Sequence, residues 1–92
     1  MTALFFRFGV WKTMYIEITI DLKNYSGDPF DIRLSNYHSI KNVIDIVWQT
    51  KQISIPPREG CWVRIINKEQ VFPGERTMSE CGITTGDRVE IL

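Results

Sequence analysis

Apolar and polar residues alternate strictly in residues 15–22, YIEITIDL. A period of two is typical of a β-strand with one buried face, which predicts inward side chains at Ile16, Ile18, Ile20 and Leu22. The turn-forming cluster KNYSGDP follows, and alternation resumes in residues 30–34 with Phe30, Ile32 and Leu34 inward. These two strands are predicted to form a hairpin.

The period of the apolar residues changes after residue 34. Ile40, Val43, Ile44 and Val47 follow one another at the spacing i, i+3, i+4, i+7, which predicts one face of an α-helix. Ser39 precedes this stripe and is predicted to be the N-cap, because its hydroxyl can accept from the free amides of the first turn. Pro56 and Pro57 cannot continue a helix, so the chain must turn before them.

Alternation returns in the last third of the chain. In residues 61–67, CWVRIIN, the pattern predicts a strand with Cys61, Val63 and Ile65 inward and with Trp62, Arg64 and Ile66 outward. A polar turn and a short strand at residues 71–72 follow. The last strand, residues 88–92, is predicted to send Val89 and Ile91 inward and Arg88, Glu90 and Leu92 outward.

The element order is therefore ββαβββ, which predicts an α+β domain. The helix has one apolar stripe, and each strand has one apolar face. The helix is therefore expected to bury its stripe against the apolar face of a mixed sheet of about five strands. Ninety-two residues with 43% hydrophobic and 24% charged residues fit one such domain.

Composition narrows the function classes. Eleven Lys and Arg balance eleven Asp and Glu, so no bulk field attracts nucleic acid or an anionic membrane, and neither is expected to bind directly. Cys61 and Cys81 form no C-x-x-C pair, so no metal site is expected. Reduced thiols in a cytosolic protein are favoured for them, with a disulfide as the alternative. No apolar run approaches the ~18 residues of a membrane-spanning helix.

Residues 1–13, MTALFFRFGVWKT, are apolar and aromatic but lack a basic start and a small-residue cleavage site. They are predicted to lie outside the domain, which is assigned to residues 14–92. Three explanations stay open: an upstream start codon chosen in error ahead of Met14, a short hydrophobic tether, and a truncated signal-like segment.

Several motifs carry a resemblance over nearly all of residues 14–92: MYIEITIDLKNYSGDPFDIRLS and SIKNVIDIVWQ, followed by PPREGCWVRIINKEQVFPGE and ERTMSECGITTGDRVEIL. In this order they resemble ubiquitin and its β-grasp relatives. Within that superfamily they are most similar to the YukD-type (EsaB-type) ubiquitin-like proteins of bacterial type VII systems, which export WXG100 proteins. The resemblance implies a ubiquitin-like β-grasp fold and a cytoplasmic accessory protein that is not an enzyme.

Ubiquitin and the sulfur carriers react through a flexible tail that ends in Gly-Gly. The sequence contains no adjacent glycines and closes on the predicted strand GDRVEIL, so conjugation is predicted to be absent. No catalytic group is expected elsewhere, because His38 and Ser39 are neighbours that cannot address one substrate atom together, and a helix-capping role suits them better. No cofactor or small-molecule substrate is expected either.

Protein binding is the remaining class. The outward side chains next to one another on two predicted strands form the candidate partner-binding surface: Trp62, Arg64, Ile66, Glu90 and Leu92. Trp and Arg are enriched in interaction hot spots, although scattered exposed apolar residues would be the simpler explanation. Ile46 and Trp48 are candidates for a second contact, and packing of Trp48 under the loop ISIPPREGC is the alternative.

Two functions compete for this binding module. The first is a non-conjugating adaptor that binds components of a type VII secretion machine and reaches the inner face of the membrane only through such partners. The second is a soluble β-grasp regulatory scaffold that is not physically part of the machine. Sulfur carriage or protein tagging is disfavoured by the missing Gly-Gly.

Overall fold

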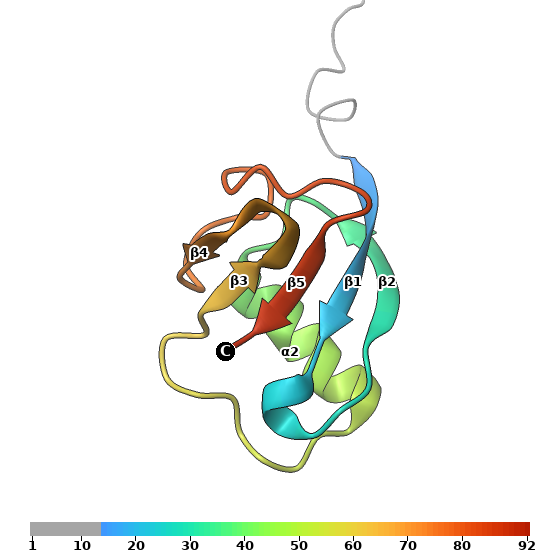
Figure 1. Cartoon of the computed structure of the whole chain (residues 1–92), viewed down its shortest axis with the longest axis vertical. Coiled ribbons are helices and arrows are strands. Elements are labelled where there is room, and N and C mark those ends of the chain that lie inside the picture. The colour runs from blue at the N-terminus through green and yellow to red at the C-terminus, as the bar shows by residue number, and fades with distance from the viewer. Residues whose placement is uncertain (1–13) are drawn as a thin grey trace, which may run out of the picture.

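A computed structural model describes residues 14–92 (Figure 1). The prediction that residues 1–13 form a separate extension lies outside the described residues. The elements, in chain order, are β1 (Tyr15–Asp21), the 3₁₀ turn η2 (Lys23–Tyr25), β2 (Phe30–Ser35), α2 (Ile40–Lys51), β3 (Val63–Ile65), the 3₁₀ turn η3 (Ile66–Lys68), β4 (Gln70–Phe72) and β5 (Arg88–Ile91).

The five strands form one mixed sheet in the order β2-β1-β5-β3-β4. The last strand, β5, lies in the middle, parallel to β1 and antiparallel to β3. The hairpin of β1 and β2 is antiparallel, with Ile18 opposite Ile32. The predicted α+β class, the element order and the number of strands are confirmed.

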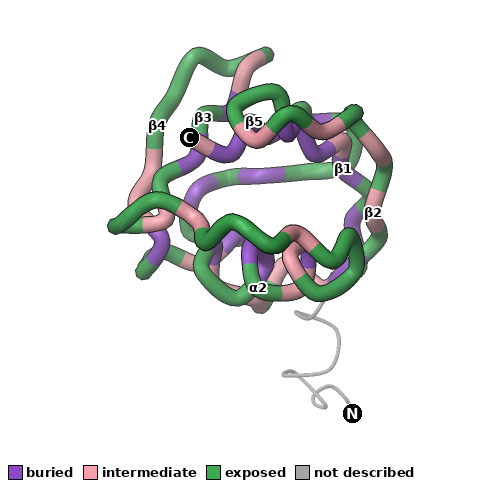
Figure 2. Tube along the Cα trace, turned by 90° about the horizontal axis from the view of Figure 1, so that it is seen from below, coloured by how far each residue is buried: buried purple, intermediate pink, exposed green. Residues whose placement is uncertain are grey.

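Helix α2 covers one face of this sheet (Figure 2), and buried residues of both layers form one hydrophobic core. The buried face of the helix is the predicted stripe of Ile40, Val43, Ile44 and Val47. The hydrophobic core also includes Ile16, Ile18, Ile20, Leu22, Leu34, Val63, Ile65, Met78, Cys81, Ile83, Val89 and Ile91. Each fully buried aliphatic side chain stabilises the fold by roughly 1.5–3 kcal/mol.

Both ends of α2 have local causes. The Ser39 Oγ accepts a hydrogen bond from the Asn42 amide at 3.0 Å, as predicted for an N-cap. At the other end Gln52 adopts a left-handed conformation, φ 52°, and the Ile53 amide donates to the Trp48 carbonyl at 3.1 Å. The helix therefore ends before the two prolines are reached.

The predicted strand over residues 61–67 is wrong at both ends. Cys61 has a φ of +51°, which is incompatible with a strand, so β3 begins at Val63. Ile66 belongs to η3, which ends in the left-handed residue Glu69, so β3 stops at Ile65. The alternation of apolar residues continues through both changes of backbone direction, which is why the sequence pattern overestimates this strand.

Both cysteines are free thiols, with Cys61 half-buried and Cys81 buried. Burial raises the pKa of the Cys81 thiol, which keeps it protonated at neutral pH. Within residues 14–92, none of the helices combines the length and the apolar character needed to cross a bilayer. The same residues contain no cluster of three or more His, Cys, Asp or Glu side chains that could bind a metal ion.

Candidate interaction face of the sheet

The face of the sheet opposite α2, here called the outer face, carries most of the predicted binding residues. The strand register sets their order across the sheet: Val71 on β4 lies opposite Arg64 on β3, and Arg64 lies opposite Glu90 on β5. Asp21 on β1 is the next neighbour of Glu90. These four outward positions thus form one row across four strands, in which Arg64 is followed by the acids Glu90 and Asp21.

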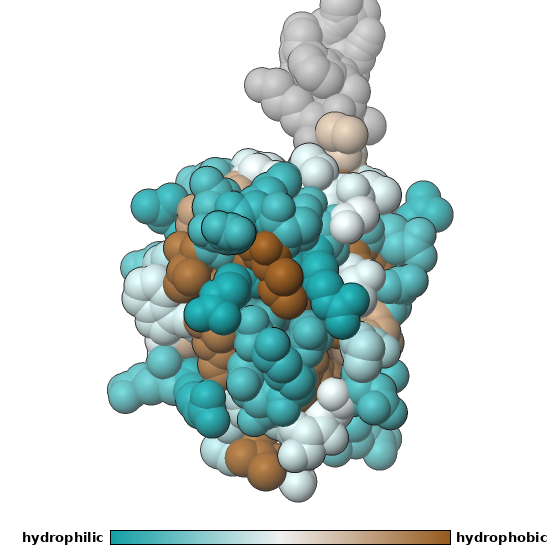
Figure 3. All heavy atoms as spheres, in the orientation of Figure 1, coloured by the Kyte–Doolittle hydropathy of each residue, from teal (hydrophilic) through white to brown (hydrophobic). Residues whose placement is uncertain are grey.

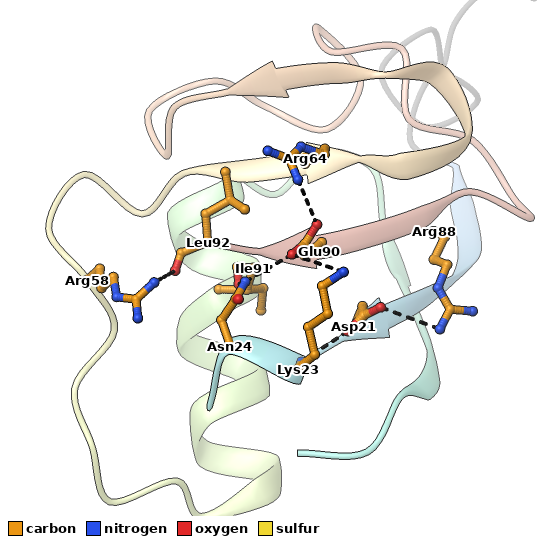
Figure 4. Close-up of polar contacts among 9 residues, drawn as sticks. All are labelled: Asp21, Lys23, Asn24, Arg58, Arg64, Arg88, Glu90, Ile91 and Leu92. Atoms are coloured by element: carbon orange, nitrogen blue, oxygen red, sulfur yellow. Dashed lines mark hydrogen bonds and ion pairs between the residues drawn. The ribbon is translucent and has the colours of Figure 1, made fainter. Parts of the chain in front are cut away.

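Glu90 lies at the centre of this row and is buried, although it points to the outer face. Its side chain is 4% exposed. Oε1 accepts from the Arg64 Nη1 at 3.2 Å, while Oε2 accepts from the Asn24 Nδ2 at 3.0 Å and pairs with the Lys23 Nζ at 3.6 Å (Figure 4). The prediction that Glu90 is an exposed contact residue is therefore wrong, because three neighbouring side chains cover it.

Asp21 repeats this arrangement on the neighbouring strand. Its Oδ2 lies 3.4 Å from the Arg88 Nη2, and its Oδ1 accepts from the Lys23 amide at 3.0 Å. The Asp21 side chain is 11% exposed and that of Arg88 45%. The outer face thus has two buried carboxylates with exposed cationic side chains above them.

Trp62 and Leu92 are neighbours at one end of the outer face. The Leu92 amide donates to the Trp62 carbonyl at 3.0 Å, which extends the β3–β5 ladder by one hydrogen bond. Trp62 is 45% exposed, and its indole lies close to Gly60, where an added Cβ would be 2.6 Å from Nε1. The Leu92 carbonyl oxygen accepts from the Tyr25 hydroxyl at 2.9 Å, so half-buried Leu92 is held against η2.

Ile66 is separated from this pair. It is half-buried in η3, at the opposite end of β3 from Trp62. The structure therefore brings together Trp62 with Leu92 and Arg64 with Glu90, but it does not join all five predicted residues into one patch. Val71, which is 45% exposed and lies opposite Arg64, is not among the predicted residues, although the register of the β3–β4 hairpin places it there.

The predicted second contact is only partly exposed. The Trp48 indole is half-buried, donates through Nε1 to the Ile55 carbonyl at 2.7 Å, and contacts the Tyr25 ring edge-on at 4.9 Å between centroids. Ile46 is half-buried on α2. The Nε1–H group is the only polar donor of the Trp48 side chain, and it is used by the loop that follows α2. Trp48 therefore packs under this loop.

Asp87 precedes β5 and is the third buried acid of the domain. Oδ1 accepts from the Asn67 Nδ2 at 2.8 Å, and Oδ2 accepts from the Thr84 amide at 3.0 Å and pairs with the Lys68 Nζ at 2.9 Å. Burial alone would raise the pKa of this carboxyl, but the hydrogen bonds and the lysine charge together outweigh it and lower the pKa. Asp87 thereby connects η3 to the loop before β5.

Figure 3 shows the outer face as mainly hydrophilic, with apolar areas separated by hydrophilic side chains. Such a surface offers little contiguous apolar area that a partner could bury.

Comparisons with known proteins identify the family of this chain. Residues 15–91 match the family model described as "WXG100 protein secretion system (Wss), protein YukD". The ESX secretion system protein YukD of Bacillus subtilis (strain 168) is 63% identical over 79 residues, which cover 86% of this chain and all of that protein.

Solved structures identify the fold. Caldiarchaeum subterraneum ubiquitin aligns with a TM-score of 0.65 at 18% identity, covering 85% of this chain and 91% of that one. A ubiquitin-like domain from tubulin-binding cofactor B aligns with a TM-score of 0.61 at 12% identity, covering 85% and 88%. At these identities the likeness shows the fold alone, and the predicted ubiquitin-like fold is confirmed.

Proposed function

Because this chain belongs to the YukD family of WXG100 protein secretion systems, we propose that it serves type VII secretion as a non-conjugating, ubiquitin-like adaptor. It binds other proteins of the secretion machine and catalyses no reaction. The observation that carries this proposal is the 63% identity to the Bacillus subtilis ESX secretion system protein, which is covered over its whole length.

The non-catalytic part of the proposal is supported by the environment of the only histidine. The His38 Nδ1 lies 2.6 Å from the Asn42 Nδ2, and the Ser39 Oγ accepts from the Asn42 amide. Both residues therefore interact with the first turn of α2. This arrangement suits a helix cap better than a nucleophile and its base.

The absence of conjugation is supported by the sequence and by the contacts of Leu92. No two glycines are adjacent in the sequence. The Leu92 amide and carbonyl oxygen are both hydrogen-bonded to the domain, and the Arg58 Nη1 lies 3.4 Å from the same oxygen. These bonds hold Leu92 against the domain and do not leave it in a flexible segment.

We place the adaptor in the cytoplasm, where it reaches the membrane only through a protein partner. The free thiols of Cys61 and Cys81 fit a reducing compartment. Trp62, Arg64 and the neighbouring Leu92 are the proposed contact residues, with Ile66 at the far end of β3. The buried Glu90 positions Arg64 by accepting a hydrogen bond from its Nη1.

The test is a pull-down of the tagged full chain from detergent-solubilised cells of its own bacterium, read by quantitative mass spectrometry. Components of the secretion machine should be enriched with the parent and depleted with a Trp62→Ala/Ile66→Ala variant. Tyr37→Ala is the matched control, because Tyr37 is 75% exposed and lies in the turn between β2 and α2. Absence of these components from every sample would reject the adaptor in favour of a soluble regulatory scaffold.

A further inference from the structure

The outer face separates its charges by depth. The carboxylates of Glu90 and Asp21 are only 4% and 11% exposed. The cationic side chains above them are 62% exposed for Lys23, 48% for Arg64 and 45% for Arg88. Figure 4 shows these cationic groups paired with the two acids. Their greater exposure means that a partner approaching this face meets ammonium and guanidinium groups before it can reach either acid.

The charges in this cluster do not cancel. Glu90 pairs with two cations, Lys23 and Arg64, whereas Asp21 pairs with Arg88. Three positive groups on two carboxylates leave one positive charge, although the whole chain has a formal net charge of zero. The excess lies on exposed side chains, where a partner's charge can interact with it.

The two arginines also keep donors for a partner. The recorded ion pairs use Nη1 of Arg64 and Nη2 of Arg88, and a guanidinium carries five N–H groups. The buried acids restrict the positions of these long side chains before any partner binds, which lowers the conformational entropy lost on binding. Exposed Trp62 and Val71 lie near Arg64 and offer apolar surface beside the charges.

We propose that Lys23, Arg64 and Arg88, here called the cationic cluster, bind an acidic segment of a protein partner, with Trp62 or Val71 packing against an apolar residue of that segment. This proposal rests on the proposed function only in that the partner is a protein. Glu90 and Asp21 are positioning residues, which hold the cationic groups without touching the partner.

An acidic protein segment suits this face better than an anionic membrane surface. Glu17 and Asp31 are exposed on the outer face, on β1 and β2, and the exposed Arg33 lies opposite Glu17. A planar membrane would bring its charges close to both acids, whereas a narrow segment can interact with the cationic cluster and avoid them. Membrane attraction of about 1 kcal/mol per basic residue also needs several uncompensated cations, and this cluster has an excess of one.

The experiment is an NMR titration of the ¹⁵N-labelled full chain at low salt with acetyl-EEEWEEE-amide, beside acetyl-QQQWQQQ-amide. The acidic peptide should shift the amide signals of residues 23, 64 and 88 and bind about tenfold more tightly than the glutamine peptide. Raising the salt to about 0.15 M should weaken it, because the interacting charges are exposed.

Lys23→Gln is the decisive variant. It removes the excess charge while Arg64 and Asn24 still pair with Glu90, so the domain should stay folded and circular dichroism can verify this. The variant should bind the acidic peptide about two- to fivefold more weakly, as expected for one exposed charge. Lys41→Gln changes an exposed lysine on α2 and should leave the affinity unchanged.

The proposal is overturned if the glutamine peptide binds as well as the acidic one, if Lys23→Gln has no effect, or if no binding is seen at millimolar peptide. Sedimentation with vesicles containing phosphatidylglycerol, without binding of the acidic peptide, overturns it in favour of a membrane. If the parent and Lys23→Gln capture secretion components equally, the proposed role of the cationic cluster is rejected and the adaptor function stands. If the acidic peptide binds but no secretion component is captured, the adaptor function is rejected and the role of the cluster stands.

Discussion

Gly60 has a φ of +90° and lies beneath the Trp62 indole. An alanine there would adopt a conformation that costs about 1–2 kcal/mol for a residue with a Cβ, and that Cβ would lie 2.6 Å from the Trp62 Nε1. Gly60→Ala should lower the free energy of unfolding by about this amount, measured in urea, and should shift the indole N–H signal of Trp62.

Gly86→Ala is the matched control for this prediction. Gly86 has a φ of +94°, but an added Cβ would meet nothing within 4 Å. Gly86→Ala should therefore lower the free energy of unfolding by about 1–2 kcal/mol but leave the indole N–H signal of Trp62 unchanged. An unchanged indole signal in Gly60→Ala would contradict the described position of Trp62.

The pH dependence of stability should report on Asp87. Its pKa is lowered below the ordinary 3.8 in the folded protein, so its stabilising contribution is complete above that pH and is lost as the pH falls through the folded pKa. Asp87→Asn should be less stable than the parent at pH 6 and should lose less further stability at about pH 3. Urea unfolding at the two pH values measures this, and Asp28→Asn, an exposed change, should behave like the parent.

For a single residue, alternation predicts which side of the sheet the side chain faces better than it predicts how exposed that side chain is. Alternation correctly places Arg64 and Glu90 on the outer face, opposite the core residues Val63 and Ile91. It cannot show that Glu90 is covered, because Asn24 and Lys23 come from a turn that lies more than 60 residues earlier in the chain. Periodicity describes one strand at a time, whereas burial depends on what the neighbouring elements bring.

Among the elements, α2 depends most on its local sequence. It has only 12 residues, a length at which an isolated helix is marginal in water, so its cap and its packing must both contribute. Ser39→Ala should lower the free energy of unfolding by about 1 kcal/mol, because the Asn42 amide loses its acceptor. Ser39→Asp should retain most of the stability, whereas an equal loss in both variants would contradict a capping role.

The elements also differ in how well the sequence predicts their limits. The start of α2 is predicted correctly, since a period near 3.6 and a capping residue agree there. The limits of β3 are not, because its alternating letters continue into left-handed Cys61 and into η3. An alternating pattern therefore fixes which residues face the core, but it does not fix the backbone conformation at the ends of a short strand.

The charge distribution becomes clear only for the whole molecule. A formal net charge of zero suggests a surface without electrostatic preference. The fold then brings β1 beside β5, which pairs Asp21 with Arg88 over a sequence separation of 67 residues. The charge arrangement on which the proposed recognition rests is thus a property of the strand order, which neither composition nor local periodicity contains.

The whole domain should fold without residues 1–13. All buried hydrophobic residues of the described chain lie between Ile16 and Ile91, and the Bacillus subtilis relative is matched completely by 79 residues of this chain. Deleting residues 1–13 should therefore change the midpoint of thermal unfolding by less than about 2 °C, because a loss of 1 kcal/mol would shift it by about 4–8 °C in a domain of this size. A fall of 5 °C or more would show that these residues contribute to the core.

The intact mass of the protein purified from its own bacterium separates the three explanations of residues 1–13. A mass that starts at Met14 supports the erroneous start codon. A mass that includes residues 1–13 supports the tether, and cleavage within them supports the signal-like segment.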